Sequence, residues 1–475
     1  MRKTKIVCTL GPATDGEGVL REMMLAGMNV ARFNFSHGTH PEHKARLEQV
    51  KALRQELDLP VAAMLDTKGP EVRLKNFAGG SVTLQEGQEF TLTVEDVEGD
   101  ATRCAVTYAE LPQDVKAGDT ILLDDGLVRL TVLSTTASAI RCRVENGGVM
   151  KDHKGVNVPG VSLSMPYMSQ QDREDILFGM EEGFDFIAAS FVRSAADVRE
   201  LRKLLESRKS RIRIIAKIEN QEGVDNIDEI LEAADGIMVA RGDLGVEIPA
   251  AKVPILQKQI IRKGLQAGKP VITATQMLDS MMRNPRPTRA EVSDVANAVF
   301  DGTSCVMLSG ETAGGKYPLE ALTAMVNIVE EAEQSIHYWR QFEKRRVIPA
   351  SNINDAITHT CCLTAKDLEA KAILAATNSG RTARMICRFR PACPVAALTM
   401  HEKVRRQLAI CWGVIPFLTG EVTSTDRIFS LSAEVALKER LVQNGDTVVI
   451  TAGVPLGKSG STNLIKAAIV NEELM

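Results

Sequence analysis

The sequence predicts an α/β protein: a (β/α)8 barrel that carries an inserted small β-barrel lid domain and is followed by an open α/β domain. Eight short apolar segments recur along the first two thirds of the chain, each followed by a turn and a segment with helical spacing. Most of these segments begin about 30 residues apart, the length of a βα unit. A β-rich stretch between the third and the fourth segment predicts the insertion.

The eight predicted barrel strands are apolar runs without polar alternation, which is typical of parallel strands covered on both faces. They begin near Thr4, Asn29, Val61, Phe184, Arg213, Gly236, Pro270 and Ser304. Because parallel neighbours need a crossover connection, this spacing favours a closed barrel of βα units.

Helical segments lie between these strands. Pro41 opens a predicted helix that runs to Leu57, and Pro318 opens another. Residues 198–205 repeat apolar side chains at helical spacing. We expect such helices to cover the outside of the barrel.

The gap between the strands that begin at Val61 and Phe184 is about four times the ordinary spacing. It contains predicted strands, separated by Gly-containing turns, at 81–84, 90–94, 120–123 and 128–132. We expect residues 70–166 to form a lid over the C-terminal face of the barrel. Residues 1–69 and 167–338 would then form the barrel itself.

A charged stretch at 343–346 follows the barrel, and residues 339–475 have the length of one more domain. Strands are predicted at 371–377, 394–399, 413–419, 446–453 and 463–470, with helical segments between most of them. This alternation predicts an open α/β sheet.

Composition excludes several classes of protein. The 475 residues include 57 basic and 61 acidic side chains, a net charge of −4, which gives no broad field for nucleic acid or an anionic membrane surface. No apolar run approaches the roughly 18 residues that a membrane span requires, and Met1–Lys5 lead into a strand without a signal-peptide segment. The nine cysteines lack CxxC spacing. We expect a reduced, cytoplasmic protein.

Polar and charged residues gather where the predicted barrel strands end, the face at which barrel enzymes carry their chemistry. They are Arg32, Asn34, Ser36, Asp66, Thr67, Lys217, Glu219, Arg241, Asp243 and Thr275. Any one of them is equally consistent with an ordinary loop start. A purely structural barrel, however, has no need to collect basic residues and carboxylates at one rim.

Glu219 and Asp243 follow sequential strands, which lie about 4.8 Å apart in a sheet. Two carboxylates at that spacing suit Mg²⁺, which completes its shell with water and substrate phosphates. They also suit the acid/base pair of a glycosidase. Lys217 lies on the same strand face as Glu219. It favours the metal, because a lysine there stabilises negative charge on an enolate or a transferring phosphoryl group.

Two further groups of strand-end residues suggest ion or anion sites. Residues 241–245 (RGDLG) are expected to start a short helix whose free N–H groups capture a carboxylate or phosphate, although Gly-Asp turns are common. Asn34, Ser36, Asp66 and Thr67 offer oxygens with a single charge. Such a cage suits a monovalent cation, although capping hydrogen bonds are the commoner use of these residue types.

Two patterns imitate known motifs. His37, His40 and His43 repeat every third residue, but a strand end, a loop and a helix start would point them in different directions, against a zinc site. Residues 453–459 (GVPLGKS) have one residue too few for a P-loop. Together with residues 377–382 (TNSGRT), they suggest either a second anion pocket, in which Arg381 and Lys458 clasp a phosphorylated small molecule, or two ordinary polar loops.

At these residues the sequence closely resembles the pyruvate kinases. The resemblance is carried, in chain order, by TKIVCTLGPAT, NVARFNFSHG, LDTKGPEVR, KGVNVPG, AKIEN, MVARGDLGVE, ATQMLDSM and SGETAGG. It covers the barrel and the lid almost completely, and the last domain in architecture more than in residues. It implies a bacterial, K⁺-dependent type without the additional C-terminal domain of some members.

The resemblance implies phosphoryl transfer from phosphoenolpyruvate to ADP, with Mg²⁺ (or Mn²⁺) and K⁺, as the last step of glycolysis. Glu219 and Asp243 would hold Mg²⁺, and Asn34, Ser36, Asp66 and Thr67 would hold K⁺. Lys217, Arg32 and Thr275 would be the catalytic residues. Lys217 and Arg32 would contact the transferring phosphoryl group, while Gly242, Asp243 and Thr275 would position the substrate carboxylate. Asn34, His37, Arg73 and Lys154 would meet the nucleotide.

The resemblance also bears on regulation and assembly. Glu71 occupies a position at which the family divides between Glu and Lys, and Glu implies K⁺ dependence. The family places an allosteric effector in the last domain, which here corresponds to Thr377, Asn378, Ser379, Gly380, Arg381, Thr382, Lys458 and Ser459. It also suggests a homotetramer. A barrel lyase or aldolase that acts on phosphoenolpyruvate or pyruvate with Mg²⁺, and a silent binder of phosphometabolites, are the alternative functions.

Overall fold

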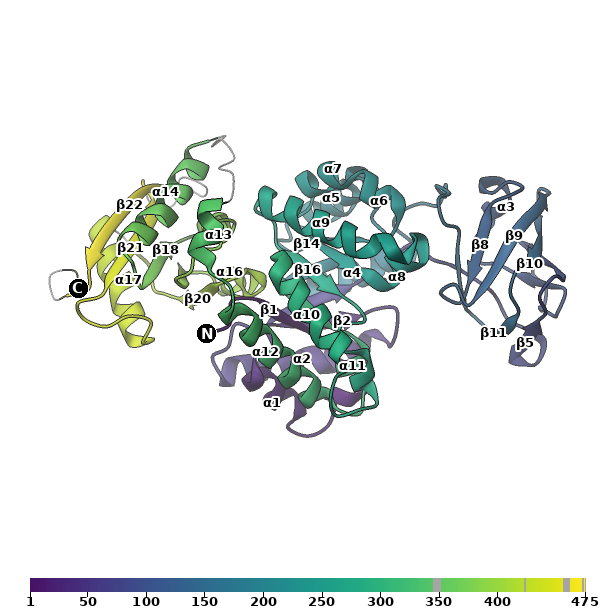
Figure 1. Cartoon of the computed structure of the whole chain (residues 1–475), viewed down its shortest axis with the longest axis horizontal. Coiled ribbons are helices and arrows are strands. Elements are labelled where there is room, and N and C mark those ends of the chain that lie inside the picture. The colour runs from purple at the N-terminus through teal and green to yellow at the C-terminus, as the bar shows by residue number, and fades with distance from the viewer. Residues whose placement is uncertain (345–351, 423, 456–461, 472–473, 475) are drawn as a thin grey trace.

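The computed structural model of the chain describes residues 1–344, 352–422, 424–455, 462–471 and 474. Figure 1 shows a barrel in the middle, a β domain at one end and an α/β domain at the other. Among the described residues, no helix has both the length and the apolar character needed to cross a bilayer.

The predicted eight-stranded barrel is confirmed. Its parallel strands close in the order β1-β17-β16-β15-β14-β13-β3-β2. Their bounds are β1 Lys5–Thr9, β2 Val30–Asn34, β3 Ala62–Asp66, β13 Phe186–Ala189, β14 Arg213–Ile218, β15 Gly236–Ala240, β16 Val271–Ala274 and β17 Cys305–Leu308.

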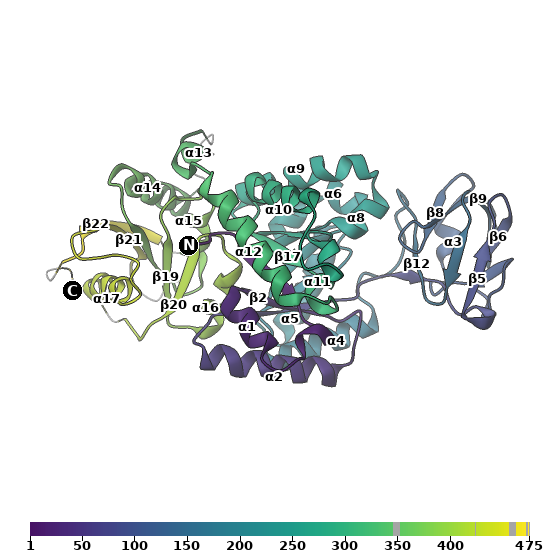
Figure 2. The ribbon, with the colours of Figure 1, turned by 60° about the horizontal axis from the view of Figure 1, so that its bottom comes forward.

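Helices surround the barrel strands (Figure 2). Their bounds are α1 Val19–Ala26, α2 His40–Glu56, α4 Gln170–Glu182, α5 Ala195–Ser207, α6 Gln221–Asp225, α7 Ile227–Ala233, α8 Arg241–Glu247, α9 Val253–Ala267, α10 Arg289–Asp301, α11 Gly310–Ala313 and α12 Pro318–Gln334. The helix predicted at Pro41 starts one residue earlier, because Thr39 caps it in a capping box with Glu42. The helix predicted at Pro318 begins there.

Alternation along each barrel strand separates two cores. In β1, Ile6 and Cys8 pack in the cluster between strands and helices, whereas Val7 belongs to the cluster inside the barrel. Met64 of β3 and Ile215 of β14 also belong to the inner cluster. Because side chains alternate between faces, the residue two positions beyond each of these lies on the inner face as well. This parity places Asp66 and Lys217 in the mouth of the barrel.

The inserted residues form a curled β domain, as predicted. A seven-stranded sheet has the order β4-β12-β8-β9-β10-β6-β7, and β11 pairs with β5 beside it. An isolated bridge between Leu74 and Val106 links the chain just beyond β4 to the chain just beyond β7, so the two outer strands of the sheet meet. The elements are β4 Val72–Arg73, β5 Ser81–Leu84, β6 Glu89–Thr93, β7 Arg103–Ala105, α3 Leu111–Asp114, β8 Thr120–Leu123, β9 Val128–Thr135, β10 Ala139–Val144, β11 Gly148–Lys151 and β12 Gly155–Asn157. The first and last strands, β4 and β12, are paired neighbours.

The described residues of the C-terminal α/β domain form five strands in the order β20-β19-β18-β21-β22, and among them only β22 is antiparallel to its neighbour. The elements are α13 Tyr338–Lys344, α14 Ile353–Asp367, β18 Ala372–Ala376, α15 Arg381–Cys387, β19 Val395–Thr399, α16 Glu402–Gln407, β20 Val414–Leu418, α17 Thr425–Lys438, β21 Thr447–Gly453 and β22 Thr462–Ile469. After β21 the next described element is β22, a strand rather than the helix that a P-loop requires.

The C-terminal domain packs on the end of the barrel at which the strands begin. Gly413 N–H donates to the Lys3 carbonyl just before β1, and Arg406 of α16 binds Asp185 just before β13. Figures 1 and 2 both show α16 between the C-terminal sheet and the barrel. The inserted β domain and the C-terminal domain therefore lie at opposite ends of the barrel.

Candidate active site

At the ends of the barrel strands, a layer of polar side chains on the inner face follows the apolar side chains that fill the inside of the barrel. Arg32 of β2, Asp66 of β3 and Lys217 of β14 are all buried there. The strand order brings these three side chains together, because β3 lies between β2 and β13, and β13 pairs with β14. Asp66 pairs directly with Asn34 on one side and with Ala188 on the other.

Lys217 lies between two carboxylates. Its Nζ is 3.0 Å from Asp66 Oδ1 and 2.9 Å from Glu219 Oε1. Burial alone would lower the pKa of Lys217, but Asp66 and Glu219 raise this pKa well above its usual value. Lys217 is therefore a fixed positive charge at neutral pH.

Arg32 is held by Asp66 from the other side. Its Nε donates to Asp66 Oδ2 at 2.6 Å, and its Nη1 donates to Thr9 Oγ1 at 2.9 Å. Burial tends to raise the pKa of Asp66, but Arg32 and Lys217 outweigh burial and hold this pKa below its usual range. Asp66 is thus an ionised carboxylate that orients two cations.

Glu219 is fully buried and only partly satisfied. Its Oε2 accepts a 2.6 Å hydrogen bond from the Phe191 N–H. Its Oε1 forms the ion pair with Lys217 but accepts no hydrogen bond of good geometry from the described residues. Burial, reinforced by Asp243 and opposed by Lys217, raises the pKa of Glu219 to about 8. A buried carboxylate oxygen with an open coordination position suits a cation.

Ser190 completes the polar layer and was not anticipated from the sequence. It follows β13, and its Oγ lies 2.7 Å from Lys217 Nζ and 2.6 Å from the Thr67 carbonyl. It is also 3.3 Å from Asp66 Oδ1. The parity of β13, in which Phe186 and Ala188 face inward, is the signal that could have found it.

Thr275 and the start of α8 lie together across the mouth. Gly242 N–H donates to Thr275 Oγ1 at 2.7 Å. Thr275 has a positive φ of 64°, in the left-handed region that non-glycine residues rarely adopt. The Arg241 side chain holds this turn, since Nη2 donates to the Thr275 carbonyl and Nη1 binds Asp294, each at 2.7 Å. The predicted short helix at residues 241–245 is confirmed as α8.

The remaining strand-end residues lie beside Asp66. Asn34 Oδ1 accepts a 3.2 Å hydrogen bond from Ser36 N–H, and Thr67 Oγ1 accepts one of 3.1 Å from Ser190 N–H. These are local hydrogen bonds of the kind such residues make at strand ends. Asp66 is the carboxylate of this set, and it already binds Arg32 and Lys217.

The three histidines have separate surroundings. His40 binds Asp175 at 2.6 Å, His43 Nε2 lies 2.9 Å from the His37 carbonyl, and His37 is exposed. Within the part of the chain that the structure describes, no group of three or more His, Cys, Asp or Glu side chains is arranged to hold a metal ion.

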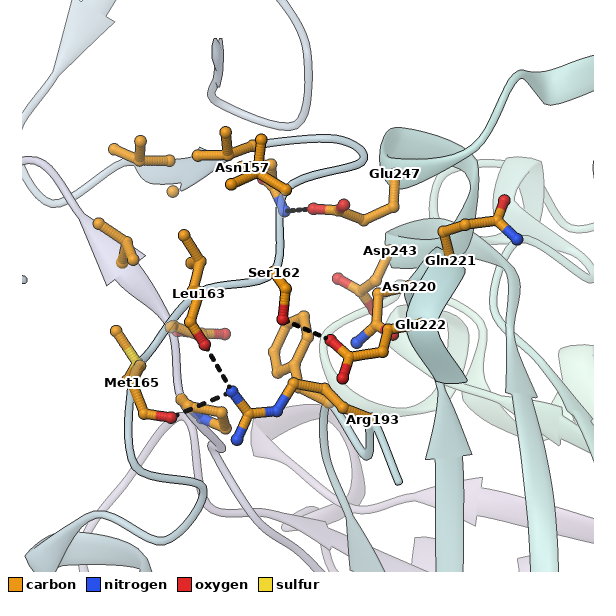
Figure 3. A pocket seen from close by; sticks show the side chains of 18 of the residues that line it. Asn157, Ser162, Leu163, Met165, Arg193, Asn220, Gln221, Glu222, Asp243 and Glu247 are labelled. Atoms are coloured by element: carbon orange, nitrogen blue, oxygen red, sulfur yellow. Dashed lines mark hydrogen bonds between the residues drawn. The ribbon is translucent and has the colours of Figure 1, made fainter. Parts of the chain in front are cut away.

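A cleft of about 480 Å³ separates the lid from the barrel (Figure 3). Asp243 and Glu247 line its barrel wall, and Glu71, Arg73 and Lys154 line the lid wall. Arg32, Lys217, Glu219, Asn34 and His37 are not among its lining residues.

The lid cations are each paired within the lid. Arg73 binds Glu71 through Nη2 at 2.6 Å, and Lys154 binds Asp124 at 2.9 Å. The structure therefore brings Asp243, Arg73 and Lys154 to one cleft but leaves the two lid cations apart from the Lys217 cluster.

The predicted effector residues that the structure describes lie in the C-terminal domain. Thr377, Asn378 and Ser379 follow β18, and Gly380, with a φ of 76°, precedes α15. Arg381 is exposed, while Thr382 Oγ1 lies 2.7 Å from Thr462 Oγ1 of β22. Lys458 and Ser459 lie outside the described residues.

Comparison with known proteins gives one consistent result. Residues 1–322 match the model of the pyruvate kinase barrel domain, and residues 355–468 match that of the pyruvate kinase alpha/beta domain. The chain is 52% identical to a pyruvate kinase of Clostridium acetobutylicum over 99% of this chain and 100% of that protein. It is also 52% identical to a pyruvate kinase of Geobacillus stearothermophilus, over all of this chain and 81% of that protein.

A solved structure agrees with the sequence comparisons. A crystal structure of a pyruvate kinase from Cryptosporidium parvum superposes with a TM-score of 0.95 at 39% identity, over 99% of this chain and 96% of that one. The two family models together match most of the chain, and the relatives named above are identical to it at about half of the aligned positions. The chain therefore belongs to the pyruvate kinase family of phosphotransferases.

Proposed function

We propose that this chain transfers the phosphoryl group of phosphoenolpyruvate to ADP, yielding pyruvate and ATP, in a reaction that depends on Mg²⁺ and K⁺. The observation that carries the proposal is the fixed ammonium of Lys217, which lies between Asp66 and Glu219 at the mouth of a barrel whose sequence is that of a pyruvate kinase. In this role the enzyme acts in the cytoplasm, at the last step of glycolysis.

The chain's own cations stabilise charge during transfer. Because phosphoryl transfer spreads negative charge over the group in flight, positioned cations supply much of the catalysis. Lys217 faces the transferring group and the enolate that remains, and Arg32 contacts the phosphate. Asp66 and Ser190 fix the Lys217 ammonium before the substrate arrives. A substrate carboxylate bound at α8 would take the N–H groups of Gly242 and Asp243, and would compete with Thr275 for the first of them.

The donor set fits both cations. Glu219, with its unsatisfied Oε1, and Asp243 would hold Mg²⁺ (or Mn²⁺). Two carboxylates leave the other positions to water and substrate oxygens, as Mg²⁺ prefers. Asn34, Ser36, Asp66 and Thr67, four oxygen-bearing residues with one carboxylate, would hold K⁺. When bound, the divalent ion supplies Lewis-acid stabilisation of the phosphoryl and enolate oxygens.

The nucleotide and its protection from water depend on the lid. Arg73 and Lys154 of the lid, with Asn34 and His37 of the barrel, would contact ADP. Lid closure over the Lys217 cluster would exclude water that otherwise accepts the phosphoryl group. We assign residues 1–69 and 167–338 to the catalytic domain and residues 70–166 to the lid.

We assign residues 339–475 to a regulatory domain that binds a phosphorylated small molecule at Thr377–Thr382, with Lys458 and Ser459. We also propose a homotetramer. Supporting self-association, β22 is an edge strand of the C-terminal sheet, and Ile469 at its end is 56% exposed. Unpaired strand edges with exposed apolar side chains are surfaces that proteins usually cover.

The test measures pyruvate formation from phosphoenolpyruvate in Mg²⁺ buffer, with and without ADP, and with K⁺ replaced by tetramethylammonium. We expect turnover only with ADP and K⁺ together. Lys217→Met should reduce turnover by about 10²- to 10³-fold, the scale of losing a group that stabilises transition-state charge, while Mn²⁺ still binds. Lys252→Met, at an exposed lysine, is the matched control. Turnover without ADP would favour a lyase, and binding of phosphoenolpyruvate without turnover would favour a silent binding protein.

A further inference from the structure

Arg213, the first residue of β14, connects the barrel to two segments of the C-terminal domain. Its Nη1 binds Asp235 Oδ1 in the barrel at 3.0 Å. Its Nε donates to Gln407 Oε1 of α16 at 3.1 Å, and its Nη2 donates to the Ser379 carbonyl at 3.2 Å. One guanidinium thus uses three donors on three separate segments of the chain.

The Ser379 carbonyl lies in the loop proposed to bind a phosphorylated effector. It accepts a second hydrogen bond, of 3.1 Å, from Arg384 Nη1 of α15. Burial, followed by repulsion from Arg213, lowers the pKa of Arg384 to about 10, so the two guanidinium groups share one crowded, poorly solvated position. An anion that binds the loop would change the electrostatic potential at both guanidinium groups. It would also change the position of the Ser379 carbonyl, to which both groups donate.

Gln407 fixes the same junction from α16. Its Nε2 donates to the carbonyls of Arg211 and Asp185, at 2.8 and 3.2 Å, while its Oε1 accepts from Arg213. Arg213 is therefore held between Asp235, which precedes β15, the effector loop and α16. A displacement of the effector loop relative to the barrel must act on this side chain.

The other end of the same strand carries the catalytic groups. Lys217 is four residues after Arg213, and Glu219 follows the end of β14. Residues 214–218 are buried, and β14 pairs on both sides, with β13 and with β15. A short strand that is hydrogen-bonded on both sides and closely packed moves as a unit rather than bending. A shift at Arg213 therefore reaches Lys217 along the strand.

We propose that Arg213 is a positioning residue that couples the 377–382 loop to Lys217 and Glu219 through β14. The inference rests on the proposed function and adds the route by which the C-terminal domain acts on the barrel site. Because coupling between two sites is reciprocal, a ligand at the barrel site must also change the loop.

Arg213→Ala removes the connection, and Arg202→Ala is the matched control. Arg202 binds the same Asp235, at 3.0 Å, and the Ala233 carbonyl, both within the barrel. We measure the KM for phosphoenolpyruvate with and without fructose 1,6-bisphosphate, glucose 6-phosphate or AMP, and the binding of the same compounds by calorimetry. The compound that lowers this KM about fivefold in the wild type should still bind Arg213→Ala but change its KM less than 1.5-fold. Arg202→Ala should respond like the wild type, and Arg213→Lys, which keeps the charge, should recover part of the response.

A second readout needs no turnover. Phosphoenolpyruvate with Mn²⁺ should slow amide exchange at residues 377–384 by at least threefold in the wild type and in Arg202→Ala, but not in Arg213→Ala. An unchanged exchange rate in the wild type, an Arg213→Ala variant that responds normally, or equal loss in Arg202→Ala would each overturn the proposal. Failure of the proposed function is distinct, since it would appear as absent ADP-dependent turnover in the wild type.

Discussion

Asn157, the last residue of β12 in the lid, donates a 2.9 Å hydrogen bond to Glu247, the last residue of α8 in the barrel (Figure 3). The two residues lie on opposite walls of the cleft that also contains Asp243, Arg73 and Lys154. Burial is the main cause that raises the pKa of Glu247, and Asn157 opposes this shift by stabilising the carboxylate. The bond therefore aligns the lid with α8, the helix at whose start we propose that the substrate carboxylate binds.

We expect Asn157→Ala to raise the KM for ADP about fivefold, with a smaller effect on the KM for phosphoenolpyruvate. The cause is the loss of a hydrogen bond to a partly exposed carboxylate, worth about 1 kcal/mol. Steady-state kinetics with each substrate varied in turn would measure it. The control is Ser162→Ala, which removes the more exposed contact to Glu222 and should change either KM less than twofold. Equal KM values for ADP in Asn157→Ala and the wild type would contradict the prediction.

Ser190 supplies a second prediction, because its hydroxyl lies 2.7 Å from the Lys217 ammonium. Ser190→Ala should lower kcat about tenfold, since losing a hydrogen bond to a charged group costs about 1.5 kcal/mol or more. The KM for ADP should hardly change. Ser207→Ala, at an exposed serine on α5, should leave kcat unaltered. A normal kcat in Ser190→Ala would show that Asp66 and Glu219 alone position the lysine.

Glu71 gives a prediction on the monovalent cation. Its Oε2 accepts two hydrogen bonds from Arg73, of 2.8 and 2.6 Å, which compensate the lid arginine. Glu71→Lys reverses the charge beside Arg73 and should make turnover in tetramethylammonium buffer at least half of that in K⁺ buffer. Glu71→Gln, without a new positive charge, should keep the K⁺ requirement. Full K⁺ dependence in Glu71→Lys would mean that a lysine at this position does not supply the positive charge that K⁺ otherwise provides.

The pH dependence of stability follows from Asp235. Burial raises the pKa of this carboxyl, but Arg213 and Arg202 outweigh burial and hold the pKa below its usual value. A depressed folded-state pKa means that the ion pairs contribute stability above the unfolded value of about 3.9 and lose it as the pH falls through the folded value. Asp235→Asn should therefore lower the free energy of unfolding at pH 7 by about 2 kcal/mol.

Denaturant unfolding of Asp235→Asn and the wild type at pH 7, 5, 4 and 3 would measure this difference. It should stay constant from pH 7 to 5 and shrink below pH 4. Asp228→Asn is the control, because Asp228 forms a surface pair with Lys263 and is 78% exposed. A stability difference for Asp235→Asn that does not depend on pH would mean that packing, and not charge, is the cause.

The barrel and much of its polar mouth could be predicted because they depend on local patterns. Strands such as β15 are continuously apolar, and the two-residue alternation fixes the side of β14 on which Lys217 and Glu219 lie. Ser190 escaped prediction because a serine after a strand is common. Its role arises only when β13 pairs with β3 across the whole insertion.

Contacts between domains were also beyond prediction. Arg73 and Lys154 form ion pairs within the lid and lie away from Lys217. The position of the lid relative to the barrel depends on contacts between residues far apart in the sequence, which local patterns do not show. The bond from Arg213 to the Ser379 carbonyl joins residues that are 166 positions apart, and no local pattern in either segment signals it.

The pairing of β4 with β12 bears on how the chain folds. The barrel closes only when β3 pairs with β13, and an unfolded insertion would make that contact the closure of a loop of about 120 residues. A folded lid holds Val72 beside Val156, so the effective loop contracts to about 35 residues and closing it costs about 1 kcal/mol less. The folded insertion thus brings the end of β3 and the start of β13 close together. The contact between these two strands then closes a loop of a length similar to that between other neighbouring strands of the barrel.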